Sequence, residues 1–221
     1  MNEQLRTIYE AALARLSYIR ASHYGFSCPL FLYVPEAYHQ GPIKLMVVGQ
    51  QTYGWGDKNV DSVDALIALY REFDLDRRYT VSPFSQAAHW LCRRLNPYGP
   101  EYAFLWSNLV RVDQRRARPS QKVKMSVSQL GLLSQEIAIT NPDAVVFFTG
   151  PHYDARLRSS FPSVEYQAVS PILARLKHYG LPVSAFKTYH PNYLRRSRQW
   201  SVLEDVVELI RTDQQRLASD T

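Results

Sequence analysis

The chain has 221 residues, of which 46% are hydrophobic and 21% are charged, and its formal net charge is +6 at pH 7. This length and composition exclude a fibrous or wholly disordered protein, and they favour a single domain over residues 1–221 with a substantial core. The basic excess permits a polyanionic partner such as nucleic acid without requiring one.

The sequence shows no sign of export, membrane insertion or metal binding. It begins with a polar stretch and an amphipathic pattern instead of a secretory signal, and no apolar run approaches the length of a membrane span. Cys28 and Cys92 are too few and too far apart for a disulfide framework or a zinc site. We therefore expect a cytoplasmic monomer without a metal, a cofactor or a membrane partner.

Apolar spacing predicts helices and strands in alternation along the chain. The expected helices cover residues 4–19, 61–73, 84–95, 126–140, 170–179 and 200–217. The expected strands are apolar runs at residues 45–48, 103–110, 143–149 and 183–188. Residues 25–42 are expected to be irregular but packed. This alternation predicts a three-layer α/β/α fold with a central four-stranded, mainly parallel sheet.

Two of the expected strands end abruptly in polar loops. One is followed by Gly49 to Gly56, with the sequence GQQTYGWG, and the other by His190 to Arg198, with the sequence HPNYLRRSR. In an open parallel sheet both loops emerge at the carboxyl edge, where ligand sites form. The first loop has neither dinucleotide nor phosphate-loop spacing, and a structural turn fits it as well as a ligand-binding loop does.

Three residues in this part of the pattern allow two interpretations each. His190 is either a structural histidine at a strand end or a catalytic one. Leu194, beside arginines in an expected polar loop, is either an ordinary surface leucine or a wedge that enters a base stack. Asn108 interrupts an apolar strand, so we expect it to be buried and hydrogen-bonded, either capping a loop or reading a base edge.

The first loop resembles the water-activating motif of the uracil-DNA glycosylase superfamily, which reads Gly-Gln-Asp-Pro-Tyr-His in the best known branch. Gly49, Gln50 and Tyr53 match that motif, whereas Gln51 replaces its aspartate. The resemblance covers about residues 40–210, although identity is confined to motif positions. An amide at Gln51 can position a water molecule but cannot accept its proton.

The other motifs follow in the family's order. Asn108 falls at the base-reading asparagine, His190 at the histidine of the His-Pro motif, and Leu194 at the intercalating leucine. Tyr79 and Phe84 are the two candidates for the aromatic residue that stacks on the base. The positions implied to contact DNA are Asn192, Leu194, Arg195, Arg196 and Arg198.

The resemblance implies a monofunctional DNA glycosylase that flips a base out of DNA and leaves an abasic site. In that scheme a neutral His190 and amides near Gln50 stabilise the departing base, while Asn108 selects it and Tyr53 crowds position 5 of the pyrimidine. Because the neighbours of Tyr53 differ from those of the uracil-specific branch, we expect a modified pyrimidine other than plain uracil. Defence against phage DNA with hypermodified cytosine is one setting that this implies, and repair is the other.

Two other classes of function remain open from the sequence. Loss of the aspartate at Gln51 favours a non-catalytic relative that binds nucleic acid without turnover. An unrelated nucleotide-binding α/β protein would need a phosphate-binding fingerprint, which the sequence lacks.

Overall fold

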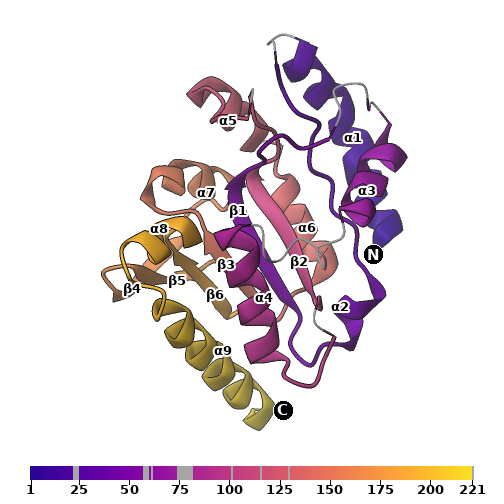
Figure 1. The fold of residues 1–221 in the computed structure, drawn as a ribbon. Coiled ribbons are helices and arrows are strands. Elements are labelled where there is room, and N and C mark those ends of the chain that lie inside the picture. Colours follow the sequence, from indigo (N-terminus) through magenta and orange to yellow (C-terminus); the bar gives the residue numbers. More distant parts are fainter. Residues whose placement is uncertain are drawn as a thin grey trace.

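A computed structural model of the protein describes residues 1–21, 25–56, 60, 62–73, 82–100, 102–114, 116–128 and 130–220. It shows a central sheet with helices on both sides (Figure 1). The strands are β1 (Leu45–Gln51), β2 (Phe104–Val110), β3 (Ala144–Phe148), β4 (Glu165–Ser170), β5 (Leu173–Lys177) and β6 (Ser184–Thr188). The helices are α1 (Asn2–Ala21), α2 (Glu36–Gln40), α3 (Val63–Glu72), α4 (Pro83–Leu95), α5 (Gln121–Ser128), α6 (Leu132–Thr140), η1 (Pro151–Tyr153), α7 (Asp154–Ser160), α8 (Pro191–Arg196) and α9 (Val202–Ser219).

The sheet has six strands in the order β2-β1-β3-β6-β5-β4. The first four strands in this order are parallel, and the hairpin of β4 and β5 adds two antiparallel strands at the β6 edge. The chain leaves β1 towards β2 on one side and leaves β3 towards β6 on the other. The carboxyl ends of β1 and β3 therefore form a topological switch point, where open α/β sheets bind ligands.

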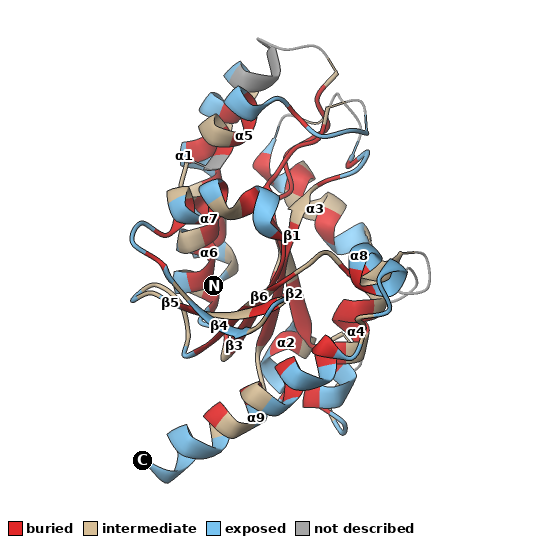
Figure 2. Ribbon diagram, turned by 90° about the vertical axis from the view of Figure 1, so that its left-hand side faces the viewer, coloured by how far each residue is buried: buried red, intermediate tan, exposed pale blue. Residues whose placement is uncertain are grey.

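Alternate residues of each central strand contact different helices. In β1, Met46 and Val48 pack in the hydrophobic cluster that includes residues of α1, α3 and α6, whereas Leu45 and Val47 pack in the cluster with α4 and α9. This is the two-residue period of a strand that is covered on both faces. Figure 2 shows that buried residues are concentrated on the strands and on the sides of the helices that face them. The expected layering of helices on both faces is confirmed.

The four predicted parallel strands are confirmed, but the prediction of a four-stranded sheet is wrong. Residues 170–179, predicted to be a helix, contain β5, which pairs with both β6 and β4. The apolar residues Leu173 and Leu176 have helical spacing, and this spacing misled the prediction. In the fold, β6 offers unpaired backbone groups along its free edge, and pairing with the hairpin satisfies them.

The helix predicted over residues 126–140 is two helices. Gly131 adopts a left-handed conformation (φ 65°) at the N-terminus of α6 and separates it from α5. This conformation is accessible to glycine at little cost and interrupts a right-handed helix. The other helices predicted from apolar spacing are present as α1, α3, α4 and α9, and residues 25–42 are irregular except for α2. Within the described residues, no helix combines the length and apolarity that crossing a bilayer requires.

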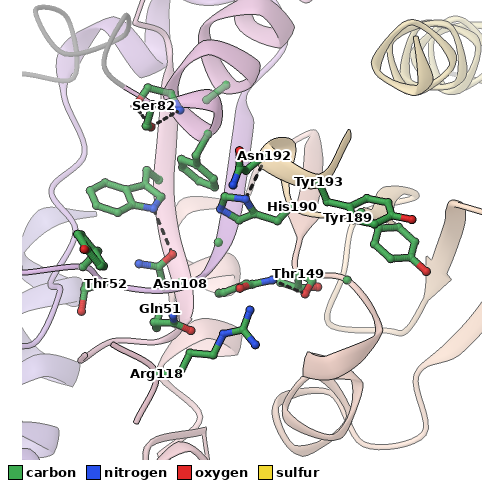
Figure 3. A pocket seen from close by; sticks show the side chains of 18 of the residues that line it. Gln51, Thr52, Ser82, Asn108, Arg118, Thr149, Tyr189, His190, Asn192 and Tyr193 are labelled. Atoms are coloured by element: carbon green, nitrogen blue, oxygen red, sulfur yellow. Dashed lines mark hydrogen bonds between the residues drawn. The ribbon is translucent and has the colours of Figure 1, made fainter. Parts of the chain in front are cut away.

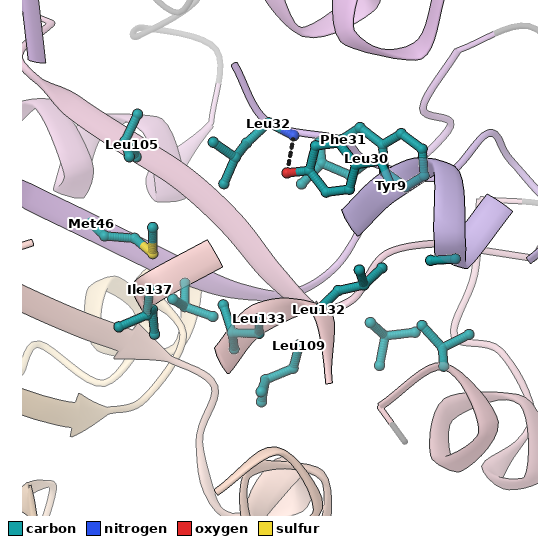
Figure 4. Packing of buried hydrophobic residues seen from close by; sticks show 14 of the residues in the cluster. Tyr9, Leu30, Phe31, Leu32, Met46, Leu105, Leu109, Leu132, Leu133 and Ile137 are labelled. Carbon is teal, nitrogen blue, oxygen red and sulfur yellow. Dashed lines mark hydrogen bonds between the residues drawn. The ribbon is translucent and has the colours of Figure 1, made fainter. Parts of the chain in front are cut away.

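The core beneath α1 and α6 contains a buried ion pair. Both guanidinium nitrogens of Arg111 lie 2.6 Å from the carboxylate oxygens of Glu136, and Ser107 donates a further hydrogen bond to Glu136 at 2.8 Å. Tyr9 of α1 donates to the same carboxylate and accepts a hydrogen bond from the backbone N–H of Leu32 (Figure 4). Arg111, at the end of β2, is therefore joined to α6 by this ion pair.

Candidate active site

A cleft of about 1290 Å³ opens at the carboxyl ends of the four parallel strands. Its lining comes from the loop after β1, from β2, from the turn after β3 and from the chain between β6 and α8, so both predicted loops contribute to it (Figure 3). The predicted site residues that line it are Gln50, Gln51, Tyr53, Phe84, Asn108, His190, Asn192 and Arg196. Leu194, Arg195 and Arg198 are not part of this lining, and Tyr79 lies outside the described residues.

Gly49 allows Asn108 to lie against the end of β1. The two residues are paired across β1 and β2, and a Cβ atom at Gly49 would lie 2.2 Å from Asn108 Oδ1 and 3.2 Å from Phe84 Cε2. No side chain fits in that space without displacing Asn108. The glycine that matched a motif in the sequence therefore has a steric role, because it makes room for two of the predicted base-binding residues.

Asn108 is buried, with its amide held in one orientation. The indole N–H of Trp106 donates to Asn108 Oδ1 at 3.3 Å, and an indole N–H can only donate. The amide oxygen therefore faces Trp106, which leaves Nδ2 as the free end. Nδ2 is buried and has no hydrogen-bond partner in the part of the chain that is described. A buried donor without a partner at a cleft is suited to a ligand's acceptor atom.

Trp106 is itself held by aromatic neighbours. Tyr70 of α3 exchanges two hydrogen bonds with the backbone of Trp106, at 2.9 and 3.1 Å. Four aromatic rings surround the Trp106 ring, at centroid distances of 5.3 Å (Trp55), 6.3 Å (Tyr70), 5.4 Å (Phe73) and 6.1 Å (Phe84). This packing fixes the direction of the indole N–H and, through it, the orientation of Asn108.

His190 is a neutral hydrogen-bond donor at the opposite side of the cleft. Its Nδ1 accepts a hydrogen bond from the backbone N–H of Asn192 at 3.2 Å, so the proton of the neutral ring is on Nε2. Burial and the positive charge of Arg118 lower the pKa of His190 to about 4. The ring stacks on Phe84, with centroids 6.1 Å apart and planes 27° apart. At neutral pH the imidazole can donate from Nε2 but carries no charge.

Gln51, one of the predicted catalytic residues, accepts a hydrogen bond from Tyr153. The hydroxyl of Tyr153 donates to Oε1 of Gln51, so the amide nitrogen is the end of Gln51 left for a ligand or a water molecule. Tyr153 is buried, and the cations of Lys124 and Arg156 lie 5.6 and 5.7 Å from its ring centroid. Two positively charged side chains therefore lie beside the tyrosine that contacts Gln51.

The shape of the loop after β1 depends on Asp113. Its carboxylate accepts from the backbone N–H groups of Gly54 at 2.7 Å, Trp55 at 3.4 Å and Arg116 at 2.9 Å. Just before this loop, Gln50 of β1 donates through Nε2 to the backbone oxygen of Thr149 at 2.9 Å. Tyr53 projects from this loop with 76% of its surface exposed. The glycine-rich loop is thus anchored at both ends and has an exposed tyrosine between them.

The structure corrects the interpretation of Leu194. The residue is in α8 instead of a polar loop, is 0% exposed, and packs in the cluster that contains residues of α4 and α9. As a core residue it cannot project into a base stack without unfolding α8, so the expectation of an exposed wedge is wrong. The predicted DNA-contacting residues Asn192, Arg195, Arg196 and Arg198 are exposed on this helix and on the turn after it.

Several residues that shape the cleft were not among the predicted site residues. Trp106 could have been found, because it is two positions before Asn108 on a strand and so shares its face. Tyr153, Asp113 and Arg118 reach the site from segments without a recognisable pattern. Among the described residues, no group of three or more histidine, cysteine or acidic side chains could hold a metal ion.

No protein-family model matches this sequence, and a comparison with curated proteins finds no significant match.

Proposed function

We propose that this chain is a monofunctional DNA glycosylase, which hydrolyses the bond between C1′ of the sugar and a flipped-out pyrimidine and leaves an abasic site. One observation carries the proposal. A neutral His190 with its proton on Nε2 and a buried Asn108 with a free Nδ2 line the same cleft at the switch point of the sheet. Two oriented donors of this kind suit a base that becomes an anion as it departs.

The proposed chemistry begins with departure of the base. The bond between C1′ and the ring nitrogen breaks, and the electron pair stays on the base. His190 donates a hydrogen bond from Nε2 to a base oxygen, which disperses the negative charge without requiring prior protonation. Phe84, already stacked on His190, supplies an aromatic surface for the base. Water then adds its oxygen to C1′, and its proton goes to solvent.

Gln51 in this scheme orients water and does not deprotonate it. Since its oxygen accepts from Tyr153, the amide nitrogen is the end that would contact the water oxygen. A donor cannot raise the nucleophilicity of water, so bond breaking must be far advanced before water attacks. The positive charges of Arg118, which lines the cleft, and of Lys124 and Arg156, which lie beside Tyr153, favour the anionic leaving group over the cationic sugar.

The site favours a base with an acceptor atom on the edge that meets Asn108. Nδ2 is a donor, and it pairs with a carbonyl oxygen, as at position 4 of uracil, better than with the amino group of cytosine. The cleft, at about 1290 Å³, is also larger than the roughly 300–1,000 Å³ of most small-molecule sites. We therefore propose a modified pyrimidine with a carbonyl edge and room for a substituent as the substrate.

A second candidate is a relative that binds nucleic acid without turnover. The specific observation in its favour is the hydrogen bond between Gln51 and Tyr153, which takes the atom that would otherwise accept from water. In such a protein the cleft would hold a flipped base, and no residue would promote its hydrolysis.

Alkali-sensitive strand breakage separates the two candidates. DNA with uracil, with 5-substituted uracils and with modified cytosines is incubated with the protein and then treated with alkali. The glycosylase proposal predicts breakage at one class of base, and His190→Ala and Asn108→Ala each lower the rate by about 10²-fold or more while DNA binding is kept. Binding without breakage on every substrate would support the second candidate.

A further inference from the structure

A stacked pair of tyrosines flanks His190 at the cleft. The ring centroids of Tyr189 and Tyr193 are 4.5 Å apart, with 23° between their planes. Figure 3 shows the pair beside His190, on the side away from Asn108. Both residues line the cleft, and Tyr193 is 46% exposed. The pair therefore presents an aromatic surface next to the proposed base site.

Tyr189 packs partly against the core cluster, but packing of α8 does not account for the exposed ring of Tyr193. The helix is held to the core by Leu194, which is fully buried, and by Pro191, which is also buried. The backbone N–H of Gln199 donates to the oxygen of Leu194 and closes the turn after the helix. Because other residues anchor the helix, an exposed aromatic ring at Tyr193 is available for a ligand.

The surroundings of the pair are positively charged. Arg195, Arg196 and Arg198 are exposed on α8 and the turn after it, and Arg196 also lines the cleft. None of these three arginines forms an ion pair with another residue that the structure describes. An aromatic surface with unpaired arginines beside it combines the two features that bind unpaired nucleobases and their phosphates.

We propose that Tyr189 and Tyr193, with the arginines of α8, form a stacking platform for an unpaired nucleobase next to the target, so that the protein binds single-stranded nucleic acid in preference to duplex. This inference rests on the proposed function for its choice of ligand. Proteins that unstack a duplex frequently insert an apolar side chain between base pairs. Leu194 is buried and the ring of Tyr193 lies nearly parallel to that of Tyr189, so the helix offers a flat ring face in place of a wedge.

Fluorescence anisotropy with undamaged oligonucleotides tests the platform. The ligands are a labelled oligothymidine, an oligouridine of equal length, and a duplex. We expect the single strands to bind more tightly than the duplex. The comparison of oligothymidine with oligouridine shows whether the platform prefers DNA or RNA. Tyr193→Ala weakens single-strand binding by about tenfold, because base–aromatic stacking is lost, whereas Tyr193→Phe binds normally.

Tyr179→Ala is the matched control, since Tyr179 is 97% exposed in the turn between β5 and β6, away from the cleft. It should leave binding unchanged. Arg196→Ala should weaken binding and reduce the slope of log affinity against log salt by about 0.7, the value for one phosphate of a single strand.

Equal losses in Tyr193→Ala and Tyr179→Ala, or duplex binding at least as tight as single-strand binding, would overturn the platform. Undamaged oligonucleotides require no turnover, so this test is independent of the glycosylase proposal. Normal platform binding without abasic-site formation would reject the enzyme and keep the platform. Abasic-site formation by the unaltered protein, together with unchanged binding in Tyr193→Ala, would reject the platform and keep the glycosylase proposal.

Discussion

His190 combines two constraints in one imidazole ring. Nδ1 accepts from the backbone of Asn192, which places the proton on Nε2, and burial with the charge of Arg118 lowers the pKa to about 4. The neutral donor is the form that the proposed reaction needs. Protonation would put a full charge in a buried site and break the hydrogen bond to Nδ1.

The pH dependence of the reaction follows from this pKa. We expect the single-turnover rate to stay level as the pH falls through 6.5, the ordinary pKa of histidine, and to decline only near pH 4. Arg118→Ala removes a positive charge, so the decline should move to higher pH. A rate profile with its acid limb at 6.5 in the unaltered protein would contradict this assignment.

The same pKa affects stability. Between pH 6.5 and about 4 the unfolded chain binds a proton at this residue and the folded protein does not, so the free energy of unfolding falls as the pH falls through that window. In His190→Ala this contribution is absent, and stability measured by urea denaturation should depend less on pH there.

Trp106 sets the selectivity that we propose for Asn108. Trp106→Phe keeps a ring among Trp55, Tyr70, Phe73 and Phe84 but removes the N–H that holds Asn108 Oδ1. The amide can then rotate and present its oxygen, so discrimination between carbonyl and amino bases should fall about tenfold, the worth of roughly one hydrogen bond. Abasic-site formation on matched uracil-type and cytosine-type substrates measures the ratio. Trp90→Phe on α4, which does not line the cleft, should leave it unchanged.

At the level of elements, the predictions succeeded where the pattern of apolar residues is compatible with only one kind of secondary structure. The start of β1 and the whole of β3 are continuous apolar runs, and a short run of this kind is stable chiefly as a strand covered on both sides. The runs of β2 and β6 are mainly apolar, although Asn108 and Lys187 interrupt them. The sequence of β5 was ambiguous, because Leu173 and Leu176 have the spacing of one helix face, whereas in the strand they pack on opposite faces of the sheet. The decision came from the free edge of β6, which belongs to a distant part of the chain.

Local sequence was also insufficient to predict helix α8, which lies at the candidate site. The segment after His190 was expected to be a polar loop, yet it forms a helix, because proline is well tolerated in the first turn, where its missing N–H has no intrahelical partner. His190 caps this helix through Nδ1, and Leu194 then points into the core one turn later. The local sequence contains the cap, but only the hydrophobic residues of α4 and α9 determine which side of α8 is buried.

At the level of the whole molecule, the ion pair of Arg111 and Glu136 connects α6 to the end of β2. Glu136→Gln keeps the shape of the side chain but leaves the guanidinium buried without a counter-charge, and should lower the free energy of unfolding by about 3–5 kcal/mol. Urea denaturation measures this change. Glu208→Gln, on the exposed side of α9, is the control and should have little effect. Equal midpoints for the two variants would show that the pair contributes no net stability.

The candidate site was predictable only in part. Gln50, Gln51, Phe84, Asn108 and His190 do meet at one cleft, because the carboxyl ends of parallel strands must lie at one edge of the sheet. Their partners were not predictable. Tyr153, which engages Gln51, and Asp113, which shapes the loop after β1, contact the site through side chains whose direction depends on the packing of other segments.

The sequence by itself determined the class of fold, the parallel strands and the edge at which polar residues gather, because these follow from the period of apolar residues and from chain direction. Only the tertiary structure decided the hairpin at the sheet edge, the burial of Leu194, the orientation of Asn108 and the lowered pKa of His190. Each of these depends on free energies of contact, desolvation or hydrogen bonding between residues far apart in the chain, and local sequence does not encode them.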